Sequence, residues 1–234
     1  MKLFGATADY DRSEILRRAE KFRSRGRVRK TIREYEKVLA VDPQDIEVHT
    51  KLAPLYIRAS RKDQAKASLN RVIAWYDKQG FVDKAIAMLR LALTLDRRDL
   101  PVHLRLADLY LGKTLTGDAL RLLEGARRTF RRKRFLKEAI AVEEKILSFA
   151  PDNFRAQVSL VRKLWKAGRR RKAGQRLWQM ESQWALRRNK KYWRKTRRLL
   201  CLHAPSLSSY WGHFISLFIS PVPYRAEQRH RFAA

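Results

Sequence analysis

Residues 51–65 read KLAPLYIRASRKDQA, and the chain repeats this phrase twice more at a spacing of 54 residues. The second copy is RLADLYLGKTLTGDA at 105–119, and the third is SLVRKLWKAGRRRKA at 159–173. The apolar frame persists through all three copies, while the rest of the third copy is strongly basic. Self-similarity at a fixed period is the signature of a repeat architecture, so this phrase decides the fold.

Several columns recur at the same interval. The aligned sets are Leu52, Leu106 and Leu160; Ala53, Ala107 and Val161; Tyr56, Tyr110 and Leu164; Ala65, Ala119 and Ala173; Pro43, Arg97, Pro151 and Pro205; and Gly26, Gly80, Arg134 and Arg188. Within a copy the apolar residues are three and four apart, which is the helical period, and no run alternates as a strand would. We therefore expect an all-α chain of about twelve helices.

The columns resemble those of the tetratricopeptide repeat (TPR) family. GRVRKTIREYEKVLAVDP at 26–43 is similar to the second helix of a TPR hairpin, and LAPLY and LADLY are similar to the first. The resemblance covers roughly residues 12–205 and implies a TPR-like helical solenoid. A TPR unit has about 34 residues, so two units would repeat at about 68. The interval of 54 is explained if one helix is shared between hairpins, which gives a unit of three helices.

The repeats divide the chain into three expected regions. Residues 1–11 form an N-terminal segment, 12–207 the solenoid, and 208–234 an aromatic and basic tail with a capping helix. The apolar stretch 210–220 would either cover the end of the solenoid, enter a partner's groove or dock shallowly on an anionic membrane. Trp193 occupies the column of Ala85 and Ala139, so we expect the last hairpin to pack differently from the others.

The charge is large and uneven. The 234 residues hold 54 Lys and Arg against 23 Asp and Glu, a net charge of +31 with a pI near 11.1. Between residues 154 and 234 there are 20 Lys and Arg and only two acids, Glu181 and Glu227. Such an excess favours acidic partners: nucleic acid, an anionic membrane surface or an acidic protein.

A stack of helical repeats leaves an extended groove, whose usual ligand is a segment of another protein. The TPR resemblance implies that basic and aromatic side chains in the later repeats face this groove. These are Arg128, Arg131, Arg155, Arg162, Trp165 and Lys166. The expected function is therefore a scaffold that binds protein partners.

The alternative is an RNA- or DNA-associated protein that binds phosphate through its basic end. RRNKKYWRKTRR at 187–198 carries eight Arg and Lys in twelve residues, and a second cluster stands at the preceding turn. Binding through such clusters is independent of sequence and sensitive to salt. The candidate patch comprises Arg169, Arg170, Arg171, Lys172, Arg187, Arg188, Lys190, Lys191, Arg194, Lys195, Arg197 and Arg198.

Signals for an enzyme are weak, and we expect no catalytic residues, cofactor or metal. The sequence Gly112-Lys113-Thr114 lacks the first glycine and the preceding strand of a phosphate-binding loop. His49 and His103 share a repeat column, which indicates packing, and the single cysteine excludes an internal disulfide. The chain begins without a secretory signal and has no apolar stretch long enough to span a bilayer, so a cytoplasmic location is expected.

Overall fold

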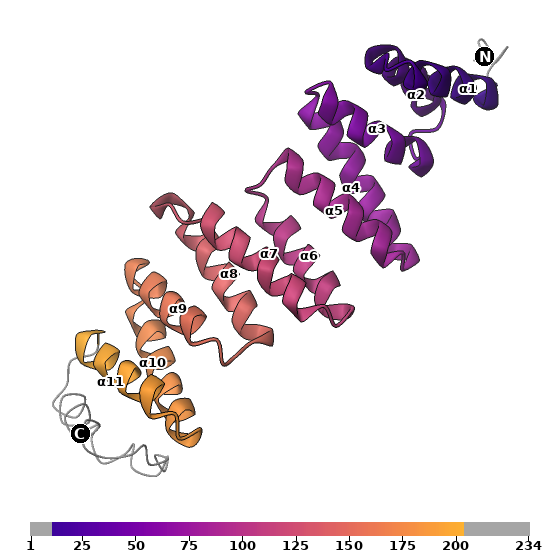
Figure 1. Ribbon diagram of the computed structural model, residues 1–234. Helices are drawn as coiled ribbons and strands as arrows, with labels where there is room; N and C mark the ends of the chain where they lie inside the picture. The colour runs from indigo at the N-terminus through magenta and orange to yellow at the C-terminus, as the bar shows by residue number, and fades with distance from the viewer. Residues whose placement is uncertain (1–10, 204–234) are drawn as a thin grey trace, which may run out of the picture. The chain divides into compact units, whose positions relative to one another are not determined.

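The computed structural model describes residues 11–203, and all of its regular structure is helical over that range. The predicted all-α repeat fold is confirmed, with eleven α-helices in the described part against the twelve expected for the chain (Figure 1). The chain forms two compact units, Met1–Ala119 and Leu120–Ala234. No helix between residues 11 and 203 is both long enough and apolar enough to cross a membrane. The tail at 208–234, with its apolar stretch 210–220, lies outside the described residues.

The first unit contains α1 (Arg12–Ser24), α2 (Val28–Val41), α3 (Ile46–Arg58), α4 (Lys62–Gln79), α5 (Val82–Leu95) and α6 (Leu100–Gly112). α7 (Thr116–Thr129) begins at the end of this unit and continues into the second. The second unit then contains a 3-10 turn (Lys133–Phe135), α8 (Leu136–Phe149), α9 (Phe154–Lys166), α10 (Arg170–Leu186) and α11 (Lys190–His203). Within α1–α6 and within α8–α11, helices adjacent in sequence contact each other and are joined by short turns.

Helix starts recur at intervals of 54 residues. α3, α6 and α9 begin at 46, 100 and 154, and α4, α7 and α10 begin at 62, 116 and 170. The side chains of Asp45, Asp99 and Asn153 cap the first series, accepting from backbone N–H groups at 3.0, 3.2 and 3.0 Å. An acceptor at this position satisfies one of the free N–H groups of a helix start.

The repeated frame is the core. Leu52, Ala53, Tyr56 and Ala65 are buried, and so are the matching residues of the other two copies. Burying an aliphatic side chain contributes about 1.5–3 kcal/mol to stability. The recurrence of this frame along the chain is therefore explained by the packing of the repeats alone.

The histidine column also has a structural role. His49 Nε2 lies 3.0 Å from the carbonyl oxygen of Pro43, and His103 Nε2 lies 3.0 Å from that of Arg97. In the third copy the amide of Gln157 donates to the carbonyl of Pro151 at 2.7 Å. Each side chain therefore bonds a carbonyl six residues earlier, at the turn before its helix. This agrees with the packing role that the sequence predicts for His49 and His103.

Two turn columns hold left-handed backbone. Ser60, Thr114 and Gly168 stand 54 residues apart and have φ of 59, 60 and 72°. The column of Gly26, Gly80, Arg134 and Arg188 also holds positive φ at three of its members, with 67° at Gly26, 73° at Gly80 and 52° at Arg188. Arg134 departs from that column, because it lies in the 3-10 turn before α8.

Thr114→Gly is expected to raise the free energy of unfolding by about 1 kcal/mol, because a β-branched residue is strained at positive φ. The matched exchange Gly168→Thr should lower it by about 1–2 kcal/mol. A Cβ at Gly168 would meet no atom within 4 Å, so its effect reports the backbone alone. Urea denaturation followed by circular dichroism measures both variants. Shifts of the same sign would contradict the strain argument.

Candidate interaction surfaces

α9 and α11 lie side by side and run in the same direction. At their starts the rings of Phe154 and Tyr192 stack with centroids 4.3 Å apart, and at their ends the rings of Trp165 and His203 lie 4.9 Å apart. Both pairs are separated by the same number of residues, so the two helices are held in one register along their length. Both helices also contact α10.

Three of the predicted groove residues share one face of α9. Arg162 and Lys166 follow Arg155 by seven and eleven residues, which is the spacing of a single helical stripe, and all three are exposed. The opposite side of α9 carries Leu160 and Leu164, which are buried. The stripe therefore points away from the core of the second unit.

The other three groove residues do not join this stripe. Trp165 is half-buried, with His203 beside its ring and the guanidinium of Arg170 5.4 Å from the ring centre. Arg128 and Arg131 are exposed, one in the last turn of α7 and the other just after it. Trp165 thus helps to join α9 to α10 and α11.

Helix geometry divides the predicted anion patch. Arg169, Arg170, Arg171 and Lys172 stand at the start of α10, and Arg187 and Arg188 stand at its end. The helix has 17 residues, which separates the two groups by about 25 Å. The patch is therefore two terminal clusters and the cations of α11, which are Lys190, Lys191, Arg194, Lys195, Arg197 and Arg198.

The Lys and Arg side chains of α11 point in different directions. Lys195 and Arg198 follow Lys191 by four and seven residues, so the three side chains form one exposed stripe. Arg197 points the other way and donates to Glu181 of α10 at 2.8 and 3.1 Å. At the end of α10, Arg187 forms an ion pair with Asp152.

Two buried carboxylates were not singled out from the sequence. Glu143 of α8 is fully buried and accepts from Arg127 Nε at 2.9 Å and from Ser159 Oγ at 2.7 Å. Lys163 Nζ also donates to it. In the last hairpin Glu181, 2% exposed, accepts from the indole N–H of Trp193 at 2.8 Å as well as from Arg197. Trp193 is therefore accommodated in its alanine column by a hydrogen bond to a buried acid.

The two ion pairs occupy the same repeat columns with their signs exchanged. Arg127 and Glu181 share one column, and Glu143 and Arg197 share the other. The copy before them holds Ile73 and Leu89 in these columns. A charge swap between equivalent positions is the signal that could have revealed the pairs from the sequence.

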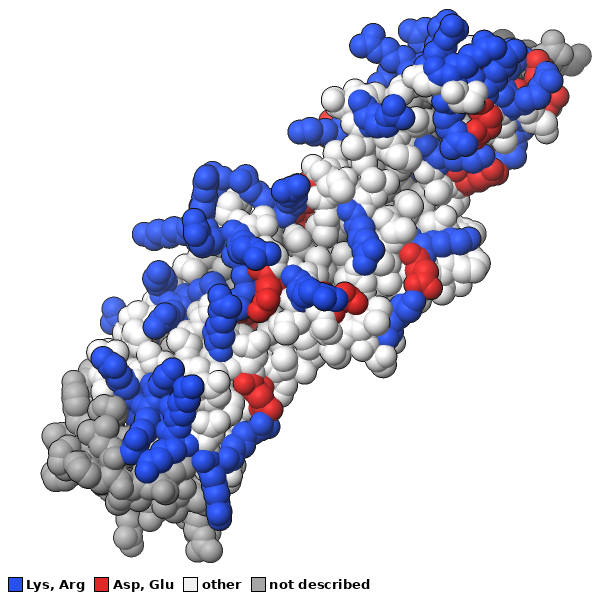
Figure 2. Space-filling view, viewed as in Figure 1, with Lys and Arg blue, Asp and Glu red and all other residues white. Residues whose placement is uncertain are grey.

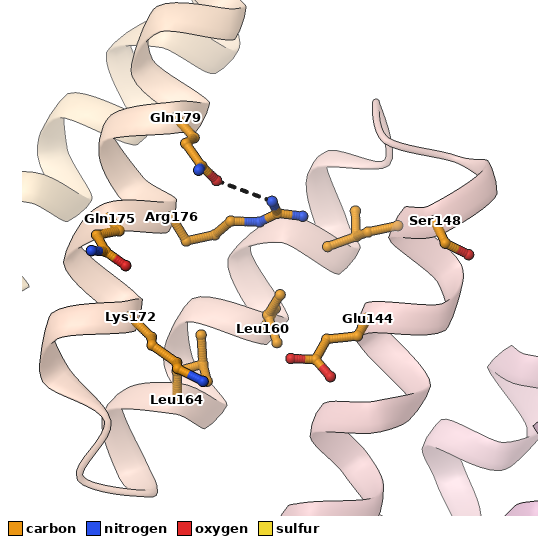
Figure 3. A pocket seen from close by; sticks show the side chains of 9 residues that line it. Glu144, Ser148, Leu160, Leu164, Lys172, Gln175, Arg176 and Gln179 are labelled. Carbon is orange, nitrogen blue, oxygen red and sulfur yellow. Dashed lines mark hydrogen bonds between the residues drawn. The ribbon is translucent and has the colours of Figure 1, made fainter.

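A depression of about 310 Å³ lies on the α10 side of α9 (Figure 3). Its floor includes Leu160 and Leu164, and its rim combines Glu144 of α8 with Lys172 and Arg176 of α10. Arg176 donates to Gln179 at 3.1 Å. Lys172 therefore lies on the opposite side of α9 from the stripe of Arg155, Arg162 and Lys166.

The first unit has a depression of about 440 Å³ between α1 and α3. It is lined by Glu20, Arg23, Ser24, Lys51, Pro54, Leu55 and Arg58. Burial alone would raise the pKa of Glu20. The hydrogen bond from Tyr35 and the charges of Arg23 and Lys51 outweigh that effect and lower the pKa. Glu20 is therefore ionised and already neutralised, while Arg58 is exposed and makes no ion pair among the described residues.

Candidate catalytic groups do not assemble in the described part of the chain. His49 and His103 bond backbone carbonyls, as above, and His203 packs against Trp165. Cys201 is partly buried.

Comparison with known proteins finds one family match, over part of the chain. A family model described as tetratricopeptide repeat matches residues 22–81, and no curated protein matches the chain. Solved structures with related folds include MamA, at 19% identity over 83% of this chain and 96% of that one, with a TM-score of 0.29. YrrB, titled a TPR protein with an unusual peptide-binding site, matches at 14% over 71% and 83%, with a TM-score of 0.28. A TPR protein of Thermus thermophilus matches at 16% over 88% and 99%, with a TM-score of 0.25.

These structural scores are too low to carry an argument about function. The fold rests on the stacked helices and their recurring caps. The tetratricopeptide-repeat match covers residues 22–81, about a quarter of the chain.

Proposed function

We propose that the chain is a non-enzymatic cytoplasmic scaffold that binds protein partners, and that a peptide segment of the partner occupies the depression between α1 and α3. The matched repeat segment overlaps this depression, and repeat proteins use such extended faces for binding. The supporting observation is its lining, which combines an apolar floor with three cations and one neutralised acid.

The chemistry of the depression selects a ligand. Pro54 and Leu55 offer an apolar contact, and Arg58 offers an unpaired guanidinium beside it. Arg23 and Lys51 are already engaged with Glu20, at 2.7 and 3.5 Å. A peptide that places an acidic side chain on Arg58 and a small apolar one on Pro54 fits this arrangement, since guanidinium–carboxylate bonds are strong and directional.

An array of short peptides, probed with the whole chain, tests the proposal. Peptides that combine acidic and apolar residues should bind, and Arg58→Glu should weaken them at least tenfold through repulsion of like charges. Arg33→Glu is the matched control, because Arg33 is exposed on α2 and forms no ion pair with any residue between 11 and 203. Equal binding by the two variants, or no preference for acidic peptides, would overturn the assignment.

A further inference from the structure

The exposed stripes of α9 and α11 together form one surface, which we name the cation face: Arg155, Arg162, Lys166, Lys191, Lys195 and Arg198. The Phe154–Tyr192 and Trp165–His203 contacts hold the two helices parallel and side by side. Figure 2 shows Lys and Arg side chains gathered over the part of the second unit where Figure 1 places these helices.

Both stripes lie on the side away from α10. Trp193 and Arg197, on the inner side of α11, reach Glu181 of α10. Leu160 and Leu164, on the inner side of α9, line the depression that α10 borders. The six cations therefore point outward in two adjacent rows.

In the described part of the chain, no acid neutralises the cation face. Within residues 11–203 no Asp or Glu forms an ion pair with any of its six members, whereas the nearby Arg187 and Arg197 are both paired. Six like charges on one face repel one another, and a bound polyanion removes that repulsion.

The composition of the face distinguishes between polyanions. Peptide ligands are held mainly by apolar and aromatic anchors in pockets. Among the large apolar side chains that are strongly exposed in the described chain, only Leu202 lies on α9 or α11, and Trp165 is half-buried against Arg170. Phosphate backbones need no such anchor, because Lys and Arg bind them by charge and by release of counterions.

From these observations we infer that the cation face binds the phosphate backbone of a nucleic acid strand, without regard to its sequence. This activity is independent of the peptide site proposed in the first unit. The two rows place three cations along each helix, which allows up to six phosphate contacts.

Fluorescence anisotropy with a labelled mixed-sequence 20-nucleotide single strand measures the interaction of the whole chain. With six phosphate contacts, affinity should fall about 300-fold between 50 and 200 mM salt. The variant Lys191→Gln/Lys195→Gln/Arg198→Gln removes three contacts, so its affinity should fall only about 20-fold over that range. At 50 mM salt its affinity should already be lower than that of the wild type.

The matched control is Arg25→Gln/Arg29→Gln/Arg33→Gln, which removes the same charge from exposed positions on the first hairpin. It should keep the wild-type salt dependence. If the control loses as much as the α11 variant, net charge and not the cation face carries the binding, and the inference fails.

Two other results would overturn it. Absence of binding at 50 mM salt removes the activity altogether. Binding of poly-glutamate as tightly as the oligonucleotide would assign the face to acidic proteins instead. In each case the peptide site can be scored separately, because the α11 variant leaves Arg58 and its depression intact.

Discussion

Glu143→Leu is expected to lower the free energy of unfolding of the second unit by about 3–5 kcal/mol. Removing one member of a buried ion pair leaves the other charge without compensation. Here two cations lose their acid, since Arg127 and Lys163 both donate to Glu143 and their side chains are only 12% and 22% exposed. Urea denaturation followed by circular dichroism measures the loss.

The double variant Arg127→Ile/Glu143→Leu is the control that separates charge from packing. It installs the residues found at the equivalent positions of the preceding copy, Ile73 and Leu89. Well-packed apolar replacements of buried ion pairs are often neutral or stabilising by 1–4 kcal/mol. We therefore expect the double variant to recover most of the loss. A single variant that costs under about 1 kcal/mol would show that Glu143 is not buried as described.

Trp193→Ala is expected to cost about 3–5 kcal/mol, the range for deleting a buried indole. Trp193 is 3% exposed, donates to Glu181 and lies beneath the guanidinium of Arg197, which is 4.6 Å from the ring centre. Its removal therefore opens a cavity and takes one donor from a buried carboxylate.

Trp193→Phe divides that cost. It keeps most of the ring but removes the N–H, so about 1–3 kcal/mol should be lost through the unsatisfied acceptor. Ala139→Trp, at the equivalent position of α8, should be destabilising because that site is close-packed around a methyl group. Stability of Trp193→Ala within about 1 kcal/mol of the wild type would contradict the packing described for the last hairpin.

The sequence predicts the frame of this fold and much less of its surfaces. Leu52, Tyr56 and Ala65 recur in register, and burial of such a frame follows directly from the helical period. Helix starts follow as well, because Asp45, Asp99 and Asn153 are capping residues at equivalent positions.

The charged residues could not be placed in the same way. Residues 187–198 read as one basic run, yet Arg197 turns inward to Glu181 while Lys195 and Arg198 face outward. The contacts of Trp165 with Arg170 and His203 depend on neighbouring helices, and local spacing in the sequence does not reveal them.

The exchanged signs of the two buried ion pairs affect which helices can pair at all. If α11 were to take the place of α8 against α7, in the same chain or in a second copy, Arg197 would stand opposite Arg127. The reciprocal mistake would set Glu143 against Glu181. Both errors bury like charges, which is far more costly than burying opposite ones. In a chain made of similar repeats, helices can be exchanged between repeats or swapped between copies of the chain. The reversed charge order therefore disfavours packing of α7 against α11 and of α10 against α8, and favours the native pairs.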